Sequence, residues 1–316
     1  MAVRKPVQAL AMAAAAASAL TYVRYRRDIA DIRAAALRGG TIAATAAGPV
    51  EYAEAGQGAP LLLIHGAGGG YDQGLLIGRM FGEGYHIIAP SRFGYLRTPA
   101  PEDASLVAQA EAHAALLDHL AIGEAIVVGV SAGAPSAIEL ALRHPDRVSA
   151  LILLVPRTYD PSQSVGVDDS ASSQVVLRLI EASSDFLFWL GTKVARGSVI
   201  RFLGVRPELE ASASDAERAR VTEVMRSILP LSERVGGLAL DSRLELSAWP
   251  LEEMRVPVLI VSAKDDLFKT LPGARFTAEH IPDAEMRILE SGGHLMVGQG
   301  AQVKAWTEDF LRRRLS

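Results

Sequence analysis

A serine flanked by two glycines is the clearest candidate for chemistry in this sequence. The stretch Gly129–Gly133 (GVSAG) follows an apolar, β-branched run over 125–128 and precedes an alanine-rich helical pattern over 134–143. This order predicts a strand, a sharp turn and a helix, with glycines where strand and helix crowd each other. Ser131 would then stand at a helix N-terminus, which favours a developing negative charge. We interpret Ser131 as a nucleophile; the alternative is a glycine-rich loop without chemistry.

A nucleophilic serine needs a base to take its proton and a third group to orient that base. His294 is the strongest candidate for the base, because the loop Ser291–His294 follows the last apolar strand. That position lies at the carboxyl edge of a parallel sheet, where crevices form in open α/β folds. We interpret His65, which precedes a glycine loop, as a structural hydrogen-bonding residue. The remaining histidines are expected on strands or on solvated helix surfaces: His86, His113, His119, His144 and His280.

Two adjacent carboxylates, Asp265 and Asp266, follow the apolar strand over 258–261. Either of them could orient the imidazole of His294, because both lie just beyond a strand end. The chain order serine, aspartate, histidine then places all three groups on loops at one edge of the sheet. This coincidence is the strongest indication of acyl-transfer chemistry in the sequence.

Acyl transfer also needs N–H groups that stabilise the oxyanion. We expect the amide of Ala132 as the first donor and that of Ala67 as the second, because glycines on both sides of Ala67 let the backbone approach closely. The alternative for the stretch His65–Gly70 is a phosphate-binding loop. However, a tyrosine stands where the last glycine of G-x-G-x-x-G would be, and no G-K-S/T motif is present. We expect neither a cofactor nor a metal ion.

Apolar strands alternate with helical patterns along most of the chain, which predicts an α/β fold with a mostly parallel sheet and helices on both faces. Between 156 and 250 the alternation stops and the pattern is mostly helical, which is most simply a lid inserted between two strands. We expect a core of residues 41–156 and 251–316 and a lid of residues 157–250. The expected strands are 41–45, 50–55, 60–64, 86–89, 125–128, 148–155, 258–261 and 285–289, and the expected helices outside the lid are 72–81, 103–120, 134–143, 271–280 and 295–314.

The lid sequence contains a run of apolar and aromatic residues over 186–190, FLFWL. This run is too apolar for a solvent-facing helix, and a helical run of this length turns to more than one face. We therefore expect at least one of Phe186, Phe188 and Trp189 to face Ser131 and contact the substrate. The alternative is that all of them belong to the core of the lid.

Residues 1–40 differ in composition from the rest of the chain. Basic residues flank the uncharged, alanine-rich run over 6–23, which is long enough to cross a bilayer. The arginines after this run suit an uncleaved anchor, so we expect a membrane-anchored protein that associates with the membrane through residues 6–23. The alternatives are a secretory signal with a cleavage site near residues 17–19, hence a periplasmic or secreted protein, and a soluble helix of a cytoplasmic one. Residues 28–38 should form a polar helix or linker.

The composition limits the remaining function classes. The chain has 316 residues and a net charge of −4, with no basic block in its body, which argues against a nucleic-acid partner. It contains no cysteine, so disulfides, a thiol nucleophile and cysteine-ligated metals are excluded.

Taken together, these motifs resemble those of the α/β-hydrolase superfamily over residues 41–314. The matching residues are His65–Gly68, Gly129–Gly133, the acid loop and Gly293-His294. The resemblance implies that the lid follows the sixth strand and that Asp266, rather than Asp265, is the acid. One departure is Ser91, where the family often has a structural aspartate.

The resemblance implies a serine hydrolase that cleaves a carboxylic ester of a small to medium hydrophobic substrate through an acyl-enzyme, with Ser131, His294 and Asp266 as the triad. Serine at the turn argues against dehalogenases and epoxide hydrolases of this fold, which use aspartate. A carbon–carbon bond hydrolase, a lactonase, an acyltransferase or a cofactor-free haloperoxidase would use the same triad. A non-catalytic ligand-binding protein on the same fold is the alternative from another class.

Overall fold

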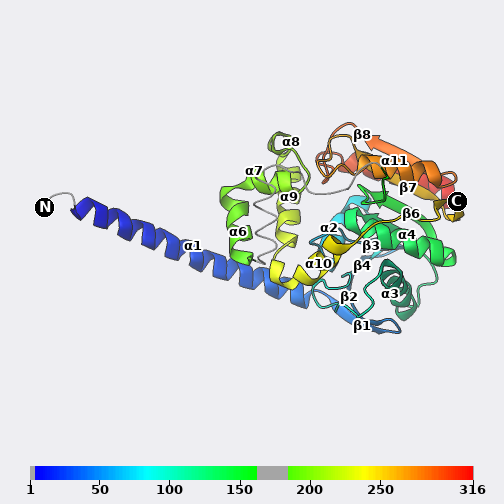
Figure 1. Ribbon diagram of the computed structural model, residues 1–316, viewed down its shortest axis with the longest axis horizontal. Coiled ribbons are helices and arrows are strands. Elements are labelled where there is room, and N and C mark those ends of the chain that lie inside the picture. The colour runs from blue at the N-terminus through cyan, green and yellow to red at the C-terminus, as the bar shows by residue number, and fades with distance from the viewer. Residues whose placement is uncertain (1–3, 162–183, 316) are drawn as a thin grey trace.

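Eight strands form one sheet in the order β1-β2-β4-β3-β5-β6-β7-β8, in a computed structural model that describes residues 4–161 and 184–315 (Figure 1). β1 pairs antiparallel with β2, and β2 antiparallel with β4, whereas all other neighbours are parallel. This confirms the predicted α/β fold with a mostly parallel sheet. The strands are β1 (Thr41–Thr45), β2 (Gly48–Gly56), β3 (Ala59–Ile64), β4 (Tyr85–Pro90), β5 (Ala125–Val130), β6 (Val148–Leu154), β7 (Val258–Ala263) and β8 (Glu285–Leu289).

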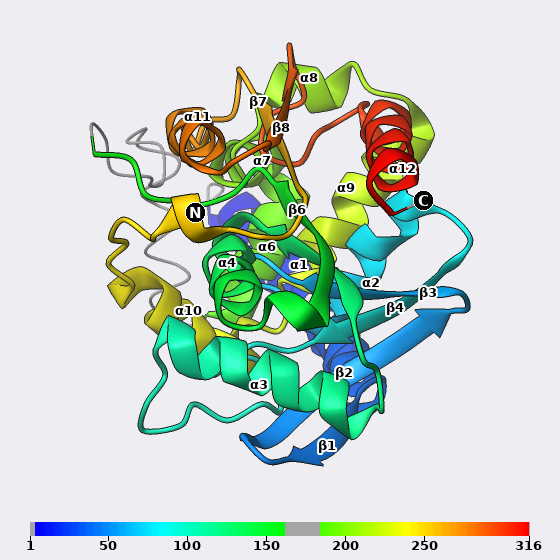
Figure 2. The same cartoon turned by 90° about the vertical axis from the view of Figure 1, so that its right-hand side faces the viewer.

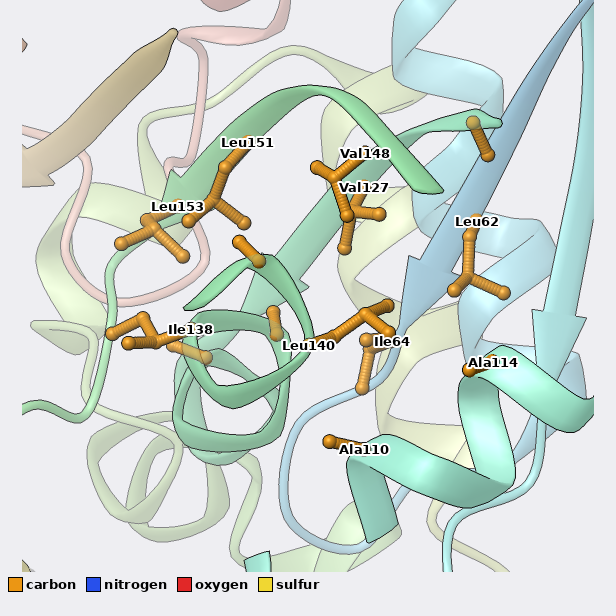
Figure 3. Close-up of a cluster of buried hydrophobic side chains, with 14 of the residues drawn as sticks. Leu62, Ile64, Ala110, Ala114, Val127, Ile138, Leu140, Val148, Leu151 and Leu153 are labelled. Carbon is orange, nitrogen blue, oxygen red and sulfur yellow. The ribbon is translucent and has the colours of Figure 1, made fainter. Parts of the chain in front are cut away.

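Helices cover both faces of the sheet, which is why the central strands are apolar along their whole length. In Figure 2, α3, α4 and α11 lie on one side of the sheet and α2 and α12 on the other. Figure 3 shows the first of these interfaces, where Leu62, Val127 and Leu151 of the sheet meet Ile138 of α4 and Ala114 of α3. The helices are α2 (Tyr71–Gly78), α3 (Leu106–His119), α4 (Ala134–Arg143), α11 (Leu271–His280) and α12 (Gly300–Leu315).

The last helix, α12, begins at Gly300 and not at residue 295 as expected. Met296 and Gly298 have φ values of 51° and 75°, which an α-helix does not accommodate. Turn hydrogen bonds hold this stretch instead, including one of 2.8 Å from the Val297 amide to the Gly292 carbonyl. Likewise, α3 begins at Leu106 because the Ser105 side chain caps it by accepting a hydrogen bond from the Ala108 amide. The residues after His294 therefore form a turn that is free to pack on other elements.

Between β6 and β7, the sixth and seventh strands, the chain leaves the sheet and forms a set of helices. We call residues 157–250 the helical insertion; its residues 162–183 lie outside the described part of the chain. Its described helices have a hydrophobic core of their own that includes Val199, Val221 and Met225. They are α6 (Asp185–Val194), α7 (Arg196–Phe202), α8 (Pro207–Ala211), α9 (Asp215–Ser227) and α10 (Val235–Arg243).

The N-terminal segment is one continuous helix, α1 (Arg4–Arg38), whose first part extends away from the rest of the molecule (Figure 1). Within the described residues, none of the helices combines the length and the apolar character that crossing a membrane requires. The expectation of a polar helix or linker over 28–38 is wrong in one respect: the segment is helical, but Ile29 and Ala36 are buried. They are buried because this end of α1 packs on the helical insertion and on Tyr71, whose hydroxyl donates to the carbonyls of Ala35 and Ala36.

Candidate active site

Ser131 lies at a sharp turn between β5 and α4, with a φ of 49° that few residues other than glycine adopt. The flanking glycines are required sterically. A Cβ on Gly129 would lie 2.8 Å from the Ala134 Cα, and a Cβ on Gly133 would lie 2.5 Å from the Ile64 carbonyl oxygen. The Ser131 carbonyl accepts a hydrogen bond of 3.0 Å from the Arg157 amide. The predicted strand–turn–helix is thus present, and it holds the serine in a strained conformation.

The structure brings Ser131, His294 and Asp266 together in one hydrogen-bonded chain. The His294 Nε2 lies 2.8 Å from the Ser131 Oγ, and the His294 Nδ1 lies 2.9 Å from the Asp266 Oδ2. A carboxylate only accepts, so Nδ1 carries the proton and Nε2 is free to accept one from the serine. The histidine and the aspartate are 8% and 6% exposed. The arrangement has the contacts and the protonation states that a base-activated serine requires.

The Asp266 carboxylate is well stabilised as an anion. Burial raises the pKa of this carboxyl, but the favourable electrostatic interaction with His294 and hydrogen bonds from His294, the Thr270 hydroxyl and the Phe268 amide together hold it below its ordinary value. The Phe268 ring also packs edge-on against the imidazole of His294, with centroids 4.5 Å apart. The aspartate is therefore anionic at neutral pH, and the imidazole is held from two sides.

Asp265, the second carboxylate of this loop, contacts a different part of the site. Its Oδ1 accepts a hydrogen bond of 2.8 Å from the Gly293 amide, and its Oδ2 accepts one of 3.3 Å from the Gly292 amide. The sequence left the choice between the two aspartates to a family pattern. The structure places Asp266 on the imidazole and Asp265 on the backbone that leads to it.

The glycine loop after β3 lies beside the serine. A Cβ on Gly66 would be 3.2 Å from the Ser131 Cβ. In this loop the Gly68 amide donates to the Tyr95 hydroxyl and the Gly69 amide to the Gly66 carbonyl. Ala132, at the first turn after the serine, is at a position where helical N–H groups have no intrahelical partner. The roles of the Ala67 and Ala132 amides as oxyanion donors stay predictions.

His65 has the structural role predicted for it. Its side chain is fully buried, its Nδ1 donates to the Gly66 carbonyl at 2.7 Å, and its Nε2 accepts from the Arg92 amide at 3.0 Å. Burial, followed by the charge of Arg92, lowers the pKa of His65 well below its ordinary value. His65 is therefore neutral, and its two hydrogen bonds join the glycine loop to the loop after β4.

His113, in contrast, does not lie on a solvated helix surface. It is 1% exposed, because the face of α3 that carries it packs against α4, where the Ser136 hydroxyl lies 3.3 Å from its Nε2. Burial and then the charge of Arg92 lower the pKa of His113 to about 3. The sequence-based expectation for this residue was wrong, since the apolar residues around it on α3 already indicated a buried face.

Buried polar groups join the helical insertion to the core beneath the glycine loop. Asp241 of α10 accepts two hydrogen bonds of 2.7 Å from the Arg92 guanidinium and one from the Tyr95 hydroxyl. Arg234, also of the insertion, is fully buried and donates to the Gly69 carbonyl. Sequence analysis missed all of these residues, because partners about 150 positions apart leave no local pattern.

Ser91, the departure from the family pattern, is also accounted for. Its hydroxyl donates to the buried carboxylate of Glu51 on β2 at 3.0 Å and accepts from the Tyr71 amide. Glu51 is fully buried and pairs with Arg97. A carboxylate is thus present at this position of the fold, but it comes from the neighbouring strand.

The aromatic run on α6 packs mainly against α1. The Phe186 and Trp189 rings contact the Tyr25 ring of α1, with centroids 5.0 and 5.7 Å apart, and the Trp189 indole donates to Asp28. These contacts place Phe186 and Trp189 against α1, and the expectation that at least one aromatic side chain of this run faces Ser131 stays a prediction. Phe188 is 1% exposed in the core of the insertion, and substrate contact stays a prediction for it.

Two other apolar side chains of the insertion lie next to the glycine loop. A Cβ on Gly68 would be 3.6 Å from Ile228 and 3.9 Å from Leu238. These residues are separated along the insertion and carry no motif, so nothing in the sequence distinguished them from its core.

Comparison with known proteins agrees with this fold. A sequence model of the alpha/beta hydrolase fold matches residues 59–301, and the chain belongs to this family. Among relatives, the chain is 26% identical over 272 residues to a 2-hydroxy-6-oxo-6-phenylhexa-2,4-dienoate hydrolase of Burkholderia cepacia, covering 82% of this chain and 89% of that protein. It is 27% identical over 245 residues to a pimeloyl-[acyl-carrier protein] methyl ester esterase of Aromatoleum aromaticum, covering 74% and 90%. An alpha/beta hydrolase fold protein of Nakamurella multipartita superposes with a TM-score of 0.66 at 27% identity, covering 86% and 99%.

Proposed function

We propose that this hydrolase cleaves a carboxylic ester of a small to medium hydrophobic substrate through an acyl-enzyme. The observation that carries the proposal is the 2.8 Å contact between the Ser131 hydroxyl and an imidazole whose other nitrogen is held by the buried Asp266 carboxylate. A serine with this contact is the usual nucleophile of acyl transfer.

In the proposed reaction, the Ser131 Oγ attacks the ester carbonyl carbon while His294 Nε2 takes the hydroxyl proton. The carbonyl oxygen becomes an oxyanion, which the amides of Ala132 and Ala67 stabilise. The imidazolium, held by Asp266, then gives its proton to the leaving alcohol as the carbon–oxygen bond breaks. Water attacks the acyl-enzyme with the same histidine as base, and the acid product and free serine result.

Apolar side chains of the insertion support the proposal that the substrate is hydrophobic. Ile228 and Leu238 lie against Gly68 in the loop that carries the proposed second oxyanion donor. They supply apolar surface beside the reacting carbonyl, which suits an apolar acyl or alcohol group. The relative from Aromatoleum aromaticum is named as a methyl ester esterase, which agrees with ester cleavage.

A second candidate is hydrolysis of a 2-hydroxy-6-oxo-dienoate. The observation that favours it is the relative named as a 2-hydroxy-6-oxo-6-phenylhexa-2,4-dienoate hydrolase, whose similarity spans most of both chains. The same serine, histidine and aspartate would serve this reaction, so substrate assays decide between the two. Lactone hydrolysis, acyl transfer and haloperoxidase activity are further reactions open to the same residues.

We also propose that residues 6–23 associate with a membrane surface. The described side chains that support this are exposed and apolar: Met12, Leu20, Tyr22 and Val23. Flotation of the full chain with vesicles of mixed neutral and anionic lipid, compared with a chain lacking residues 1–23, tests this proposal. Equal recovery of both forms in the vesicle-free fraction would contradict it.

The test of the proposed reaction is labelling with a fluorophosphonate, read by intact mass, followed by turnover of p-nitrophenyl esters of graded chain length. We expect one adduct on the peptide that carries Ser131 and no adduct on Ser131→Ala. A dienoate substrate is assayed in parallel. Absence of labelling on folded protein would indicate a non-catalytic binding protein, and labelling with turnover of the dienoate alone would favour the second candidate.

A further inference from the structure

The loop that carries Asp266 and the loop that carries His294 meet at a single carbonyl oxygen of the helical insertion. The Gly204 oxygen accepts a hydrogen bond of 3.0 Å from the His294 amide and one of 3.1 Å from the Leu267 amide. A carbonyl has two lone pairs, so one oxygen can accept both bonds. Leu267 directly follows Asp266 in the chain. The two amides that share this oxygen therefore belong to, or adjoin, the residues whose side chains pair at 2.9 Å.

Local geometry explains why a glycine occupies this position. Gly204 follows α7 with a φ of 77°, its amide donates to the Arg201 carbonyl, and the Val205 amide donates to the Ile200 carbonyl. These two bonds form the Schellman motif that ends many helices, with glycine at the left-handed position. The motif turns the chain so that the Gly204 carbonyl points away from its own helix and remains available to the two site loops.

Space around Gly204 adds a second requirement beyond the helix end. A Cβ at this position would lie 2.5 Å from the His294 Cβ and 2.9 Å from the Phe268 ring. An ordinary contact begins near 3.4 Å, so a methyl group would have to move the histidine by about 1 Å. If Gly204 served only to end the helix, the side chain of His294 would not have to lie where a Cβ at this position would be.

The insertion also holds the turn after His294. The Arg220 guanidinium donates to the Leu295 carbonyl at 2.7 Å, and Glu217 accepts from the Gly298 amide at 2.9 Å. Glu217 and Arg220 are paired with each other on α9. The turn is thus fixed by side chains of α9, whereas the backbone amide of His294 itself is bound by the Gly204 carbonyl.

We propose that Gly204 is a positioning residue of the site: its carbonyl joins the aspartate loop to the histidine loop, and its missing side chain leaves the space that His294 occupies. The inference rests on the proposed function of His294 as the base. It makes the insertion part of what sets the angle of the imidazole, in addition to its contacts beside the glycine loop.

The test compares Gly204→Ala with Gly84→Ala. Gly84 has a φ of 94°, is exposed, and a Cβ there would meet nothing within 4 Å, so its substitution imposes comparable backbone strain without a clash. Gly204→Ala should lower kcat about 100-fold with a small change in KM, since displacement by about 1 Å at a reacting group has this order of effect. Gly84→Ala should retain the wild-type kcat. Gly204→Asn is the second variant, because asparagine tolerates a positive φ but still brings a Cβ against His294.

Two measurements read the geometry independently of turnover. The proton between His294 Nδ1 and Asp266 should give a far-downfield NMR resonance that shifts or disappears in both Gly204 variants and persists in Gly84→Ala. In the wild-type protein, hydrogen exchange should show the His294 and Leu267 amides protected together. If the wild-type protein does not cleave esters but the NMR and exchange results are as expected, the proposed function is refuted and the inference about Gly204 stands. An unchanged resonance and kcat in the Gly204 variants, an equal loss in Gly84→Ala, or free exchange of either amide would overturn the inference.

Discussion

Asp241→Asn removes the charge from the buried ion pair that joins the helical insertion to the core. The Arg92 and Asp241 side chains are 8% and 9% exposed, and the pairing is bidentate, with both bonds at 2.7 Å. Asparagine keeps the shape of the side chain but leaves the Arg92 guanidinium buried without a counter-ion. Loss of one partner of a buried pair costs about 3–5 kcal/mol, and we expect the free energy of unfolding to fall by this amount.

The arginine cannot escape this cost by releasing its proton. A guanidinium is basic enough to stay protonated in proteins even when no carboxylate lies beside it. A double variant, Arg92→Met with Asp241→Asn, leaves neither charge of this pair. Its destabilisation should therefore be smaller than the sum of the two single variants by about 3 kcal/mol.

Urea denaturation of the wild type, both single variants and the double variant measures this coupling. The matched control is Glu223→Gln, because Glu223 and Arg79 also pair the insertion with the core, but with side chains 54% and 71% exposed. An exposed pair contributes less than about 1 kcal/mol, so this variant should unfold nearly as the wild type does. The reasoning is refuted if Asp241→Asn costs no more than the control, or if the costs of the two charge-removing variants simply add.

Three further predictions concern the acid loop, α1 and the buried His113. Asp266→Asn should lower kcat about 10³–10⁴-fold, whereas Asp265→Asn should lower it less than about 10-fold. The reverse order in ester assays would show that Asp265, and not Asp266, orients the imidazole. Removal of residues 1–23 should leave the melting temperature unchanged, whereas removal of 1–40 should lower it, because the second deletion takes away buried side chains; equal melting temperatures would contradict the packing of α1. His113 has a pKa of about 3 in the folded protein, below its ordinary value of 6.5, so the unfolded chain binds its proton first and stability falls as the pH drops from 6.5 towards 3. His113→Leu should reduce the loss of unfolding free energy between about pH 7 and pH 5 by about 2 kcal/mol, and an unchanged loss in urea titrations would show that this histidine is not buried neutral.

The contacts among Ser131, His294 and Asp266 were predictable from the sequence because each depends on a local pattern. A strand that ends at the same edge of a parallel sheet precedes each residue, so the alternation of strands and helices already placed the three loops together. The choice of Asp266 over Asp265 was of another kind. Both lie within three residues of the end of β7, and only the turn of the loop decides which carboxylate meets the imidazole.

The packing of α1 was missed although the sequence contains its signal. Tyr25, Ile29, Ile32 and Ala36 recur at the spacing of one helix face, which is typical of a helix with a buried side. Ile29 and Ala36 are buried, and Tyr25 and Ile32 pack against the core of the insertion. The composition of the alanine-rich run before this stripe does not distinguish a helix that extends into solvent from one that packs on the protein. The stripe assigns the second half of α1 to the folded body.

The contacts between the insertion and the site could not be predicted, because each joins residues that are distant in the chain and have no periodic pattern. Arg234 binds the carbonyl of Gly69 in the glycine loop, and the Gly204 carbonyl binds the loops of the acid and the histidine. These bonds involve backbone groups of the core, which every sequence supplies, so no residue type in the core marks them. A change in the insertion can therefore alter the geometry of the site without changing any residue that touches substrate. The sheet fixes only where each loop of the site begins. The insertion therefore takes part in fixing where the side chains of those loops lie.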